Sequence, residues 1–252
     1  MKAMILAAGR GTRLHPLTEK VPKALIPLDG IPLLEILILR LKQSGFDRIT
    51  LNVHHFGQQI IDFLESRDHF GLSIDVSDER DCLLDTGGAI KKAMPLLGDG
   101  EPVLIHNVDV ISSVDLAALV RHHVQAEALV TLCVQERASS RYFYFSSDDR
   151  LCGWKNLKTG QEKRVQTDAN PDKQRAFSGI HVIGPRFLEM VARHHCFPAN
   201  MDVFSIVDVY LCLAAKGKVI GFDHTGEAWT DLGNPQQLAK MEESITRKRR
   251  NP

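Results

Sequence analysis

An excess of charge of one sign and long apolar runs are both missing from this 252-residue sequence. Its 31 Lys and Arg residues balance 31 Asp and Glu residues, whereas proteins that hold nucleic acid by bulk electrostatics usually carry a strongly basic face. No segment approaches the ~18 apolar residues of a membrane-spanning helix, and the apolar stretch after Lys2 is too short for a signal peptide. We therefore expect a cytoplasmic protein that binds neither nucleic acid nor a membrane.

Cysteine is scarce and irregularly placed. The chain has five cysteines, an odd number, with no CxxC pair among them. This pattern fits neither a disulfide framework nor a zinc ribbon. The residues are Cys82, Cys133, Cys152, Cys196 and Cys212. We expect all five thiols to be reduced and structural.

The sequence does contain an alternation of short apolar runs and amphipathic segments. Strands are expected over residues 2–8, 48–54, 72–77 and 102–106, and helices over 32–44, 58–65 and 86–94. Such alternation indicates βαβ crossovers. It predicts an α/β, Rossmann-like fold, in which a mostly parallel sheet carries helices on both faces.

The second half of the chain has a different texture. A hairpin is expected over residues 142–154, with further strands at 128–135, 177–183 and 219–223 and helices at 116–123, 206–216 and 236–246. The polar stretch between Trp154 and Phe177 is predicted to be a long loop, and loops of that length tend to be functional. No internal repeat is present. The simplest prediction is one domain over residues 1–252, with a small antiparallel insertion in its second half.

The first predicted strand ends in a glycine-rich turn, LAAGRGTRL. Backbone amides of such turns can cradle phosphate groups, and here they come from Ala8, Gly9, Gly11 and Thr12. Neither the third glycine of the dinucleotide fingerprint nor the GK[ST] of a Walker A motif is present. The turn instead carries a cation, Arg13, and a second cation, Lys23, follows ten residues later, so the sequence predicts a polyanionic ligand.

The longer run LAAGRGTRLHPLTEKVPKALIPLDGIPLL closely resembles LAAGxGxRLxPLTxxxPKxLxPxxxxPxL, the signature of the sugar-phosphate nucleotidyltransferases, or nucleoside diphosphate sugar pyrophosphorylases. The two agree at every defined position from Leu6 to Leu34. The resemblance continues at Thr86, Gly87 and Gly88, at Asn107 and Asp109, at residues 177–180, and at WTDLGNP from Trp229. It therefore spans essentially the whole chain.

The resemblance implies attack by a sugar 1-phosphate on the α-phosphorus of a nucleoside triphosphate, which yields an NDP-sugar and pyrophosphate. Two anions must meet, so a divalent metal and fixed cations lower the barrier by neutralising charge. Mg²⁺ needs only one or two carboxylates besides phosphate oxygens and water. The implied metal ligands are Asp109 and Asp231, and the implied catalytic cations are Arg13 and Lys23.

The resemblance also implies a division of labour. Residues 1–125 would mainly bind the nucleotide, and 126–235 mainly the sugar phosphate. The first half would use the glycine-rich turn with Thr86, Gly87, Gly88 and Asn107. The second half would use Trp154, Lys155, Asn156 and Gly179.

One departure from the family lies after the hairpin. Many members carry a Glu-Lys pair after an aromatic residue there, which binds the sugar and its phosphate, whereas this chain has Lys155 and Asn156 after Trp154. Lys155 could still meet the sugar phosphate. Glu162 and Lys163 could substitute only if the polar loop folds back.

Each assignment has a structural alternative. Asp109 could cap the next helix, Asp231 could be a turn residue, the paired glycines could simply start a helix, and Gly179 could mark a bulge. The alternative functions are a cytidylyltransferase for another phosphorylated alcohol, such as phosphocholine, and an inactive regulatory subunit that binds sugar nucleotides. Because both carboxylates and both cations are present, we favour an enzyme. The nucleobase, the sugar and any homo-oligomer stay open at this point.

Overall fold

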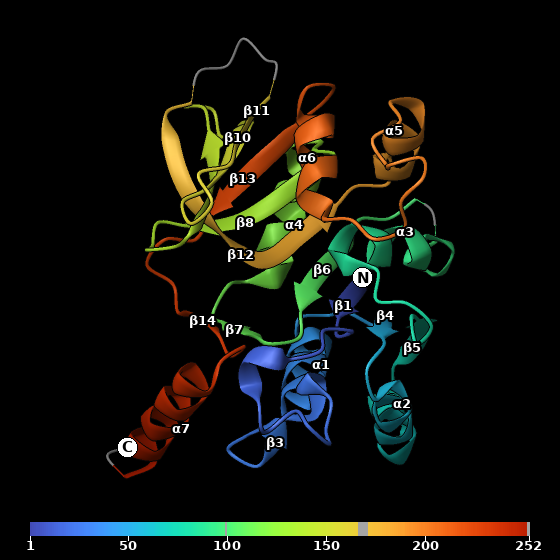
Figure 1. Ribbon diagram of the computed structural model, residues 1–252, viewed down its shortest axis with the longest axis vertical. Coiled ribbons are helices and arrows are strands. Elements are labelled where there is room, and N and C mark those ends of the chain that lie inside the picture. Colours follow the sequence, from blue (N-terminus) through green and yellow to red (C-terminus); the bar gives the residue numbers. More distant parts are fainter. Residues whose placement is uncertain (99, 166–170, 251–252) are drawn as a thin grey trace.

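The computed structural model describes residues 1–98, 100–165 and 171–250. At one end of its main sheet, four strands run parallel in the order β6-β1-β4-β5 (Figure 1). They are β6 (Val103–Asn107), β1 (Lys2–Leu6), β4 (Arg48–Val53) and β5 (Ser73–Asp78). The predicted α/β class with a parallel core is confirmed.

Helices cover both faces of this sheet. Successive residues of a strand point to opposite faces, so Ala3 and Ile5 of β1 enter one apolar cluster and Met4 enters another. The cluster around Ala3 includes α1 (Leu33–Gln43), α2 (Gly57–Ser66) and α4 (Leu116–Gln125). The cluster around Met4 includes α3 (Asp85–Leu97), α5 (Phe187–Arg193) and α6 (Ile206–Ala214). Among the helices described, none is long and apolar enough to cross a membrane.

The antiparallel part of the sheet is larger than the small insertion that we expected. Its central strand, β12 (Lys173–Ile183), runs antiparallel to β6 and to two further strands. The other members are β8 (Val130–Gln135), β9 (Arg141–Phe145), β10 (Leu151–Asn156), β11 (Glu162–Arg164) and β13 (Val219–Asp223). As a result the sheet is mixed, with a parallel core, and β12 joins its two parts.

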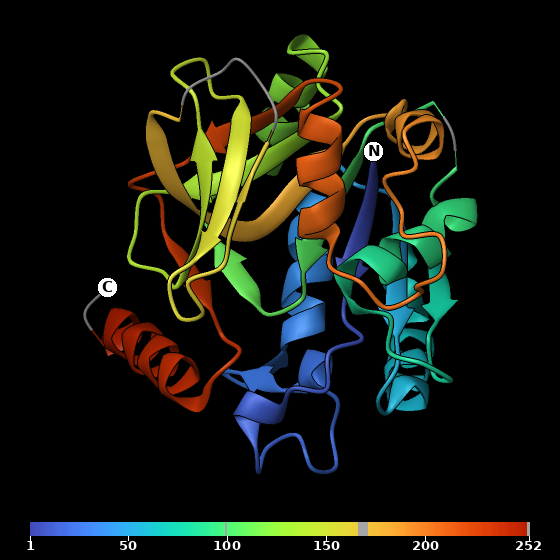
Figure 2. The same cartoon turned by 45° about the horizontal axis from the view of Figure 1, so that its top comes forward.

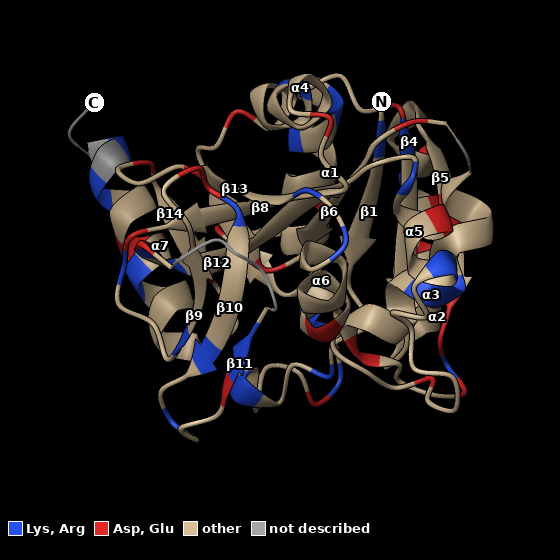
Figure 3. Ribbon diagram, turned by 90° about the horizontal axis from the view of Figure 1, so that it is seen from above, with Lys and Arg blue, Asp and Glu red and all other residues tan. Residues whose placement is uncertain are grey.

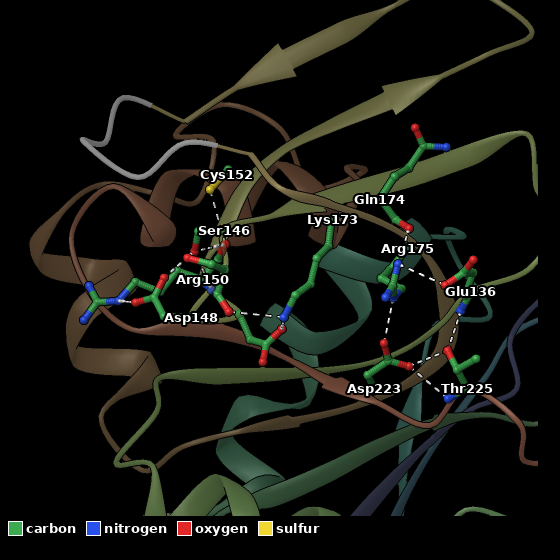
Figure 4. Close-up of polar contacts among 12 residues, drawn as sticks. Glu136, Ser146, Asp148, Arg150, Cys152, Lys173, Gln174, Arg175, Asp223 and Thr225 are labelled. Carbon is green, nitrogen blue, oxygen red and sulfur yellow. Dashed lines mark hydrogen bonds and ion pairs between the residues drawn. The ribbon is translucent and has the colours of Figure 1, made fainter.

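The hairpin that the sequence predicts is present as β9 and β10. Its turn is closed by Ser146, whose backbone N–H donates to Arg150 O at 2.9 Å and whose hydroxyl donates to Asp148 at 2.5 Å (Figure 4). At the neighbouring edge Lys173 pairs with Asp149 at 2.7 Å. These contacts fix the hairpin against the start of β12.

Part of the predicted long loop is a strand. β11 pairs with β10 in antiparallel register, so this stretch folds back onto the hairpin. Its polar residues give no apolar alternation, and its position depends on backbone pairing to β10, which sequence patterns do not show. Residues 166–170 of the predicted loop lie outside the described residues.

The expectation that all five cysteines are reduced is wrong for one pair. Cys196 and Cys212 form a disulfide across 16 positions of sequence, linking the segment after α5 to α6. No CxxC or other motif marks the pair, because only packing of α5 against α6 brings the two residues together. Cys133 and Cys152 are buried free thiols, and Cys82 is exposed.

Several short elements complete the chain. Between β1 and α1 lie two 3₁₀ turns, Thr12–Leu14 and Lys23–Leu25, and the two-stranded ribbon β2 (Pro27–Leu28) and β3 (Ile31–Pro32). A third 3₁₀ turn spans Asp68–Gly71. The C-terminal helix α7 (Pro235–Arg250) packs through Leu238 on a small apolar cluster with Leu14 and Leu28.

Candidate active site

A short antiparallel ribbon joins two distant parts of the chain at the carboxyl end of β6. β7 (Val110–Ser112) pairs with β14 (Trp229–Asp231), with Asp231 opposite Val110. The backbone N–H of Leu232 also donates to Asp109 O at 2.8 Å. This ribbon brings Asp231 beside Asp109, which lies in the turn between β6 and β7.

Two cations lie against the two carboxylates. Lys23, from the second 3₁₀ turn, donates to Asp109 Oδ2, and both side chains are largely buried. The Nη2 atom of Arg13, from the first 3₁₀ turn, lies 3.7 Å from Asp231 Oδ2. All four residues named from the sequence as catalytic therefore meet at one place.

Gly233 lies directly beside the two carboxylates and Arg13. Its backbone N–H donates to Asp231 Oδ1 at 2.7 Å. A Cβ atom at Gly233 would lie 2.6 Å from Asp231 Oδ1 and 2.9 Å from Asp109 Oδ2, and closer still to Nη2 of Arg13. Only glycine leaves this space open. The sequence did not single out Gly233, although its position in WTDLGNP, two residues after Asp231, was an available signal.

The two carboxyl groups have opposite pKa shifts. Burial raises the pKa of Asp109, but the charge and hydrogen bond of Lys23 outweigh burial, so the net pKa of Asp109 is lowered. Burial also raises the pKa of Asp231, and the negative charge of Asp109 raises it further. Two close carboxylates repel, so the pair is stable with one proton or with a cation between them.

This arrangement fits a magnesium ion. Mg²⁺ binds through one or two carboxylates and takes its other ligands from phosphate oxygens and water. Across the described parts of the chain no cluster of three His, Cys, Asp or Glu side chains is suited to a metal. Two carboxylates around an open space are what a metal shared with substrate phosphates requires.

A cavity of about 490 Å³ opens beside these four residues. It is also lined by Ala8, Gly9, Thr86 and Asn107 from the predicted nucleotide-binding set. Gly11 and Thr12 are not among its lining residues. Gly11 has a φ of 65° and lies directly before the first 3₁₀ turn, and its carbonyl accepts a hydrogen bond from Thr18 at 2.9 Å. Gly11 therefore shapes the turn that carries Arg13.

Two buried polar residues that the sequence did not single out fix the start of this turn. Asn52, at the end of β4, accepts hydrogen bonds from the N–H groups of Ala7 at 2.7 Å and Ala8 at 3.4 Å. Its amide donates in turn to Glu79 at 2.8 Å. Glu79 is fully buried, and burial raises the pKa of its carboxyl group. Both residues lie at the carboxyl ends of parallel strands, where ligand sites of open sheets form.

The paired glycines of α3 have a packing role. A Cβ at Gly87 would overlap the ring of Phe204, and a Cβ at Gly88 would overlap the carbonyl oxygen of Asp202. The N–H of Gly87 donates to Phe204 O at 2.9 Å. The structure thus places both glycines under the segment that leads into α6, and neither lines the 490 Å³ cavity.

Across Asn107 from this cavity lie two further cavities, of about 640 and 500 Å³. Trp154 lines both, Asn156 lines the smaller and Gly179 the larger. Gly179 has a φ of 73° at a register shift in β12, and a Cβ there would lie 2.7 Å from Asn107 Nδ2. Gly179 is therefore both a bulge residue and part of the cavity wall.

The larger cavity is rich in cations. Besides Arg13 it is lined by Arg137, Arg141 and Lys158, none of which the sequence had singled out. Arg137 is held in place, since its guanidinium carbon lies 3.7 Å from the centroid of the Trp229 ring and its Nη2 donates to Phe177 O at 2.8 Å. These cations lie on two separate loops and a strand, so they form no recognisable sequence motif.

Lys155 does not join these residues. Trp154 and Asn156 face the cavities, whereas Lys155 is on the other face of β10, where it pairs with Glu162 at 3.1 Å. Strand alternation is the physical reason. The loop that contains Glu162 and Lys163 does fold back, and it brings Lys163 but not Glu162 to the smaller cavity.

Comparison with known proteins agrees with this geometry. The family model described as Nucleotidyl transferase matches residues 2–248. The chain is 31% identical over 242 residues to an N-acetylmuramate α-1-phosphate uridylyltransferase of Neisseria meningitidis serogroup B, covering 96% of this chain and 97% of that protein. It is 33% identical over 247 residues to the protein of that name in Caulobacter vibrioides, covering 93% and 92%.

The fold is also shared with solved structures. One is a putative glucose-1-phosphate thymidylyltransferase from Bacillus anthracis in complex with a sucrose, with a TM-score of 0.80 at 19% identity, covering 97% of this chain and 94% of that one. At that identity the match concerns the fold, whereas the family model and the two relatives concern the sequence. The chain therefore belongs to the nucleotidyl transferase family and is a sugar-1-phosphate nucleotidyltransferase.

Proposed function

We propose that this enzyme is magnesium-dependent, with Asp109 and Asp231 as the protein ligands of the metal. The observation that carries the proposal is the convergence of both carboxylates, Arg13 and Lys23 around the open space at Gly233. When bound, Mg²⁺ would neutralise phosphate charge and help to hold the reacting groups in line.

The chain's own residues would bind and orient the two substrates. The triphosphate would occupy the 490 Å³ cavity, with its phosphates against Arg13 and Lys23, and Asn52 would keep the glycine-rich turn in the shape that receives it. The acceptor would occupy the cavities beyond Asn107, against Trp154, Asn156 and Gly179. This arrangement supports the division into a nucleotide half, 1–125, and a sugar-phosphate half, 126–235, of one domain.

Lys23 would act on the metal site as well as on the phosphates. Its ammonium group lowers the pKa of Asp109 and so favours the ionised carboxylate, which is the state that a metal requires. Arg13 lies against Asp231 at the same rim, with a side chain 62% exposed, so its fork of donors is available to a phosphate group. Fixed cations of this kind stabilise the charge that develops on the transferred phosphate.

The cationic cavity suggests which acceptor to test first. Arg137, Arg141 and Lys158 provide more positive charge than a single phosphate needs, which favours an acceptor with a further acidic group. The two bacterial relatives are named for N-acetylmuramate α-1-phosphate, a sugar phosphate that carries a carboxylate. We therefore propose UTP and N-acetylmuramate 1-phosphate as the first pair.

A pyrophosphate-release screen would test the proposal. Four nucleoside triphosphates would be combined with N-acetylmuramate, glucose and mannose 1-phosphates and with phosphocholine, each with magnesium and with EDTA. We expect release with at least one sugar 1-phosphate and none in EDTA. Turnover with CTP and phosphocholine alone would support the cytidylyltransferase alternative. No release with any pair, together with binding of a sugar nucleotide, would support the regulatory alternative.

A further inference from the structure

Two lysines lie next to each other in the antiparallel sheet beside the acceptor cavities, on opposite faces. In the pairing of β10 with β11, Trp154 is opposite Lys163 and Lys155 is opposite Glu162. Side chains directly opposite in an antiparallel pair share a face, and successive residues alternate between faces. Trp154 and Lys163 therefore share the face toward the cavities, and Lys155 and Glu162 share the other.

On the far face the charges satisfy one another. Glu162 accepts from Lys155 Nζ at 3.1 Å and from Arg164 Nε at 2.6 Å. The hydrogen bond and charge of Glu162 raise the pKa of Lys155. None of these three side chains lines any of the three cavities. Lys155 is thus bound to surface partners on the side away from the acceptor.

On the cavity face, the side chain of Lys163 is placed where it could bind an anion. It lines the 500 Å³ cavity with Trp154 and Asn156, and its Nζ lies 5.8 Å from the centroid of the Trp154 ring. Its ammonium group donates to Asp208, in the first turn of α6. α6 lies between the antiparallel strands and α3 (Figure 2), and basic segments mark β11 beside it (Figure 3).

The position of the 500 Å³ cavity indicates which anion Lys163 would bind. It shares Asp85, Thr86 and Asn107 with the 490 Å³ cavity, so the two meet along these residues. In the reaction the acceptor's phosphate must lie at such a junction, because its oxygen attacks the α-phosphorus in the neighbouring cavity. A cation on the acceptor side of the junction is therefore placed for the acceptor's phosphate.

We propose that Lys163 of β11 binds the phosphate group of the acceptor, and that its ammonium group exchanges the ion pair with Asp208 for the phosphate when the acceptor binds. The inference rests on the proposed function. A phosphate dianion carries more charge than one carboxylate and draws the lysine away from Asp208. Asp208 remains stabilised after the exchange, because a carboxylate in the first turn of a helix interacts favourably with the helix dipole.

Steady-state kinetics on the acceptor turned over best in the screen would test this. Lys163→Met should raise the KM for the acceptor about 10- to 100-fold, the range expected for one lost charge-assisted hydrogen bond, and leave the KM for the nucleoside triphosphate unchanged. Lys163→Arg should restore most of the acceptor KM. Lys155→Met tests the competing assignment and should change either KM by less than about twofold. Lys173→Met, which removes a lysine paired with Asp149 away from the three cavities, is the matched control.

The Asp208→Asn variant distinguishes two roles of Lys163, binding of the acceptor phosphate and structural support of β11 against α6. If Lys163 only braced β11 against α6, Asp208→Asn and Lys163→Met would raise the acceptor KM equally, and the proposal would be overturned. We expect the Asp208 variant to bind the acceptor at least as tightly as wild type, because a competing carboxylate is lost. A rise in acceptor KM for Lys155→Met with none for Lys163→Met would also overturn it. Failure of the proposed function looks different, since the wild-type enzyme would then release no pyrophosphate.

Discussion

A single methyl group should close the metal site. In Gly233→Ala the new Cβ would lie 2.6 Å from Asp231 Oδ1 and 2.9 Å from Asp109 Oδ2, whereas ordinary contacts begin at 3.4 Å. The carboxylates and Arg13 must then move by roughly 0.5–1 Å, and a misplacement of about 1 Å at a reacting centre costs on the order of 100-fold in rate. We expect kcat/KM to fall by about that factor or more, with a higher magnesium requirement.

Folding should be affected far less than catalysis. The backbone of Gly233 is not in the left-handed region, so alanine brings no backbone strain there, and its lower unfolded-state entropy is worth about 0.4–1 kcal/mol in favour of folding. The free energy of unfolding of Gly233→Ala, measured in urea, should therefore differ from that of wild type by about 1 kcal/mol or less.

Gly184→Ala supplies the matched control. Its Cβ would lie 2.8 Å from the Ala128 carbonyl oxygen, and Gly184 lines none of the three cavities. We expect this variant to lose stability and keep its turnover. Wild-type kinetics in a folded Gly233→Ala protein would refute the argument that the space at Gly233 receives a ligand.

Three further outcomes follow from the buried carboxyl groups. Asp109→Asn and Asp231→Asn should each remove most activity, and the double variant should lose far less than the product of the two effects because the pair acts as a unit; multiplicative losses would show two independent sites. Because the pKa of Asp231 is raised, protons compete with the metal for this carboxylate. Calorimetry should therefore show that magnesium affinity weakens as the pH falls in wild type, and less steeply in Asp231→Asn. The pKa of Glu79 is also raised, so its contribution to stability is complete below about pH 4.3 and is lost as the pH rises through the folded-state pKa. In urea unfolding, wild type should therefore gain stability relative to Glu79→Gln as the pH falls, and a difference that is independent of pH would contradict this.

The nucleotide side could be predicted from the sequence because its signals are local. The strand, turn and cations from Leu6 to Lys23 lie within one short stretch, and residues at the carboxyl ends of parallel strands meet at one edge of the sheet. That rule places Asp109 there without any long-range information. Asn52 and Glu79 obey the same rule, but their role is to hold the backbone of the turn, and no charge or glycine pattern marks such a role.

Other parts of the site depend on contacts between distant segments. Gly87 and Gly88 have a sequence signature that suits a ligand, yet the neighbour that excludes a side chain is the segment at Asp202 and Phe204. The disulfide of Cys196 depends in the same way on how α5 packs against α6. In both cases the partner is far away in sequence and carries no motif of its own.

The acceptor side shows how strand register decides chemistry. Moving a charged residue by one position along a strand transfers it to the opposite face, so a lysine directly after Trp154 points away from the cavity that Trp154 lines. The register of β11 then determines which residue takes its place, and in this chain it is Lys163. A change of one residue in the β10–β11 register would move Glu162 toward the cavity and Lys163 away from it, replacing an attractive charge with a repulsive one for any phosphate. Acceptor recognition in this enzyme should therefore be more sensitive to insertions between β10 and β11 than to substitution of Lys155.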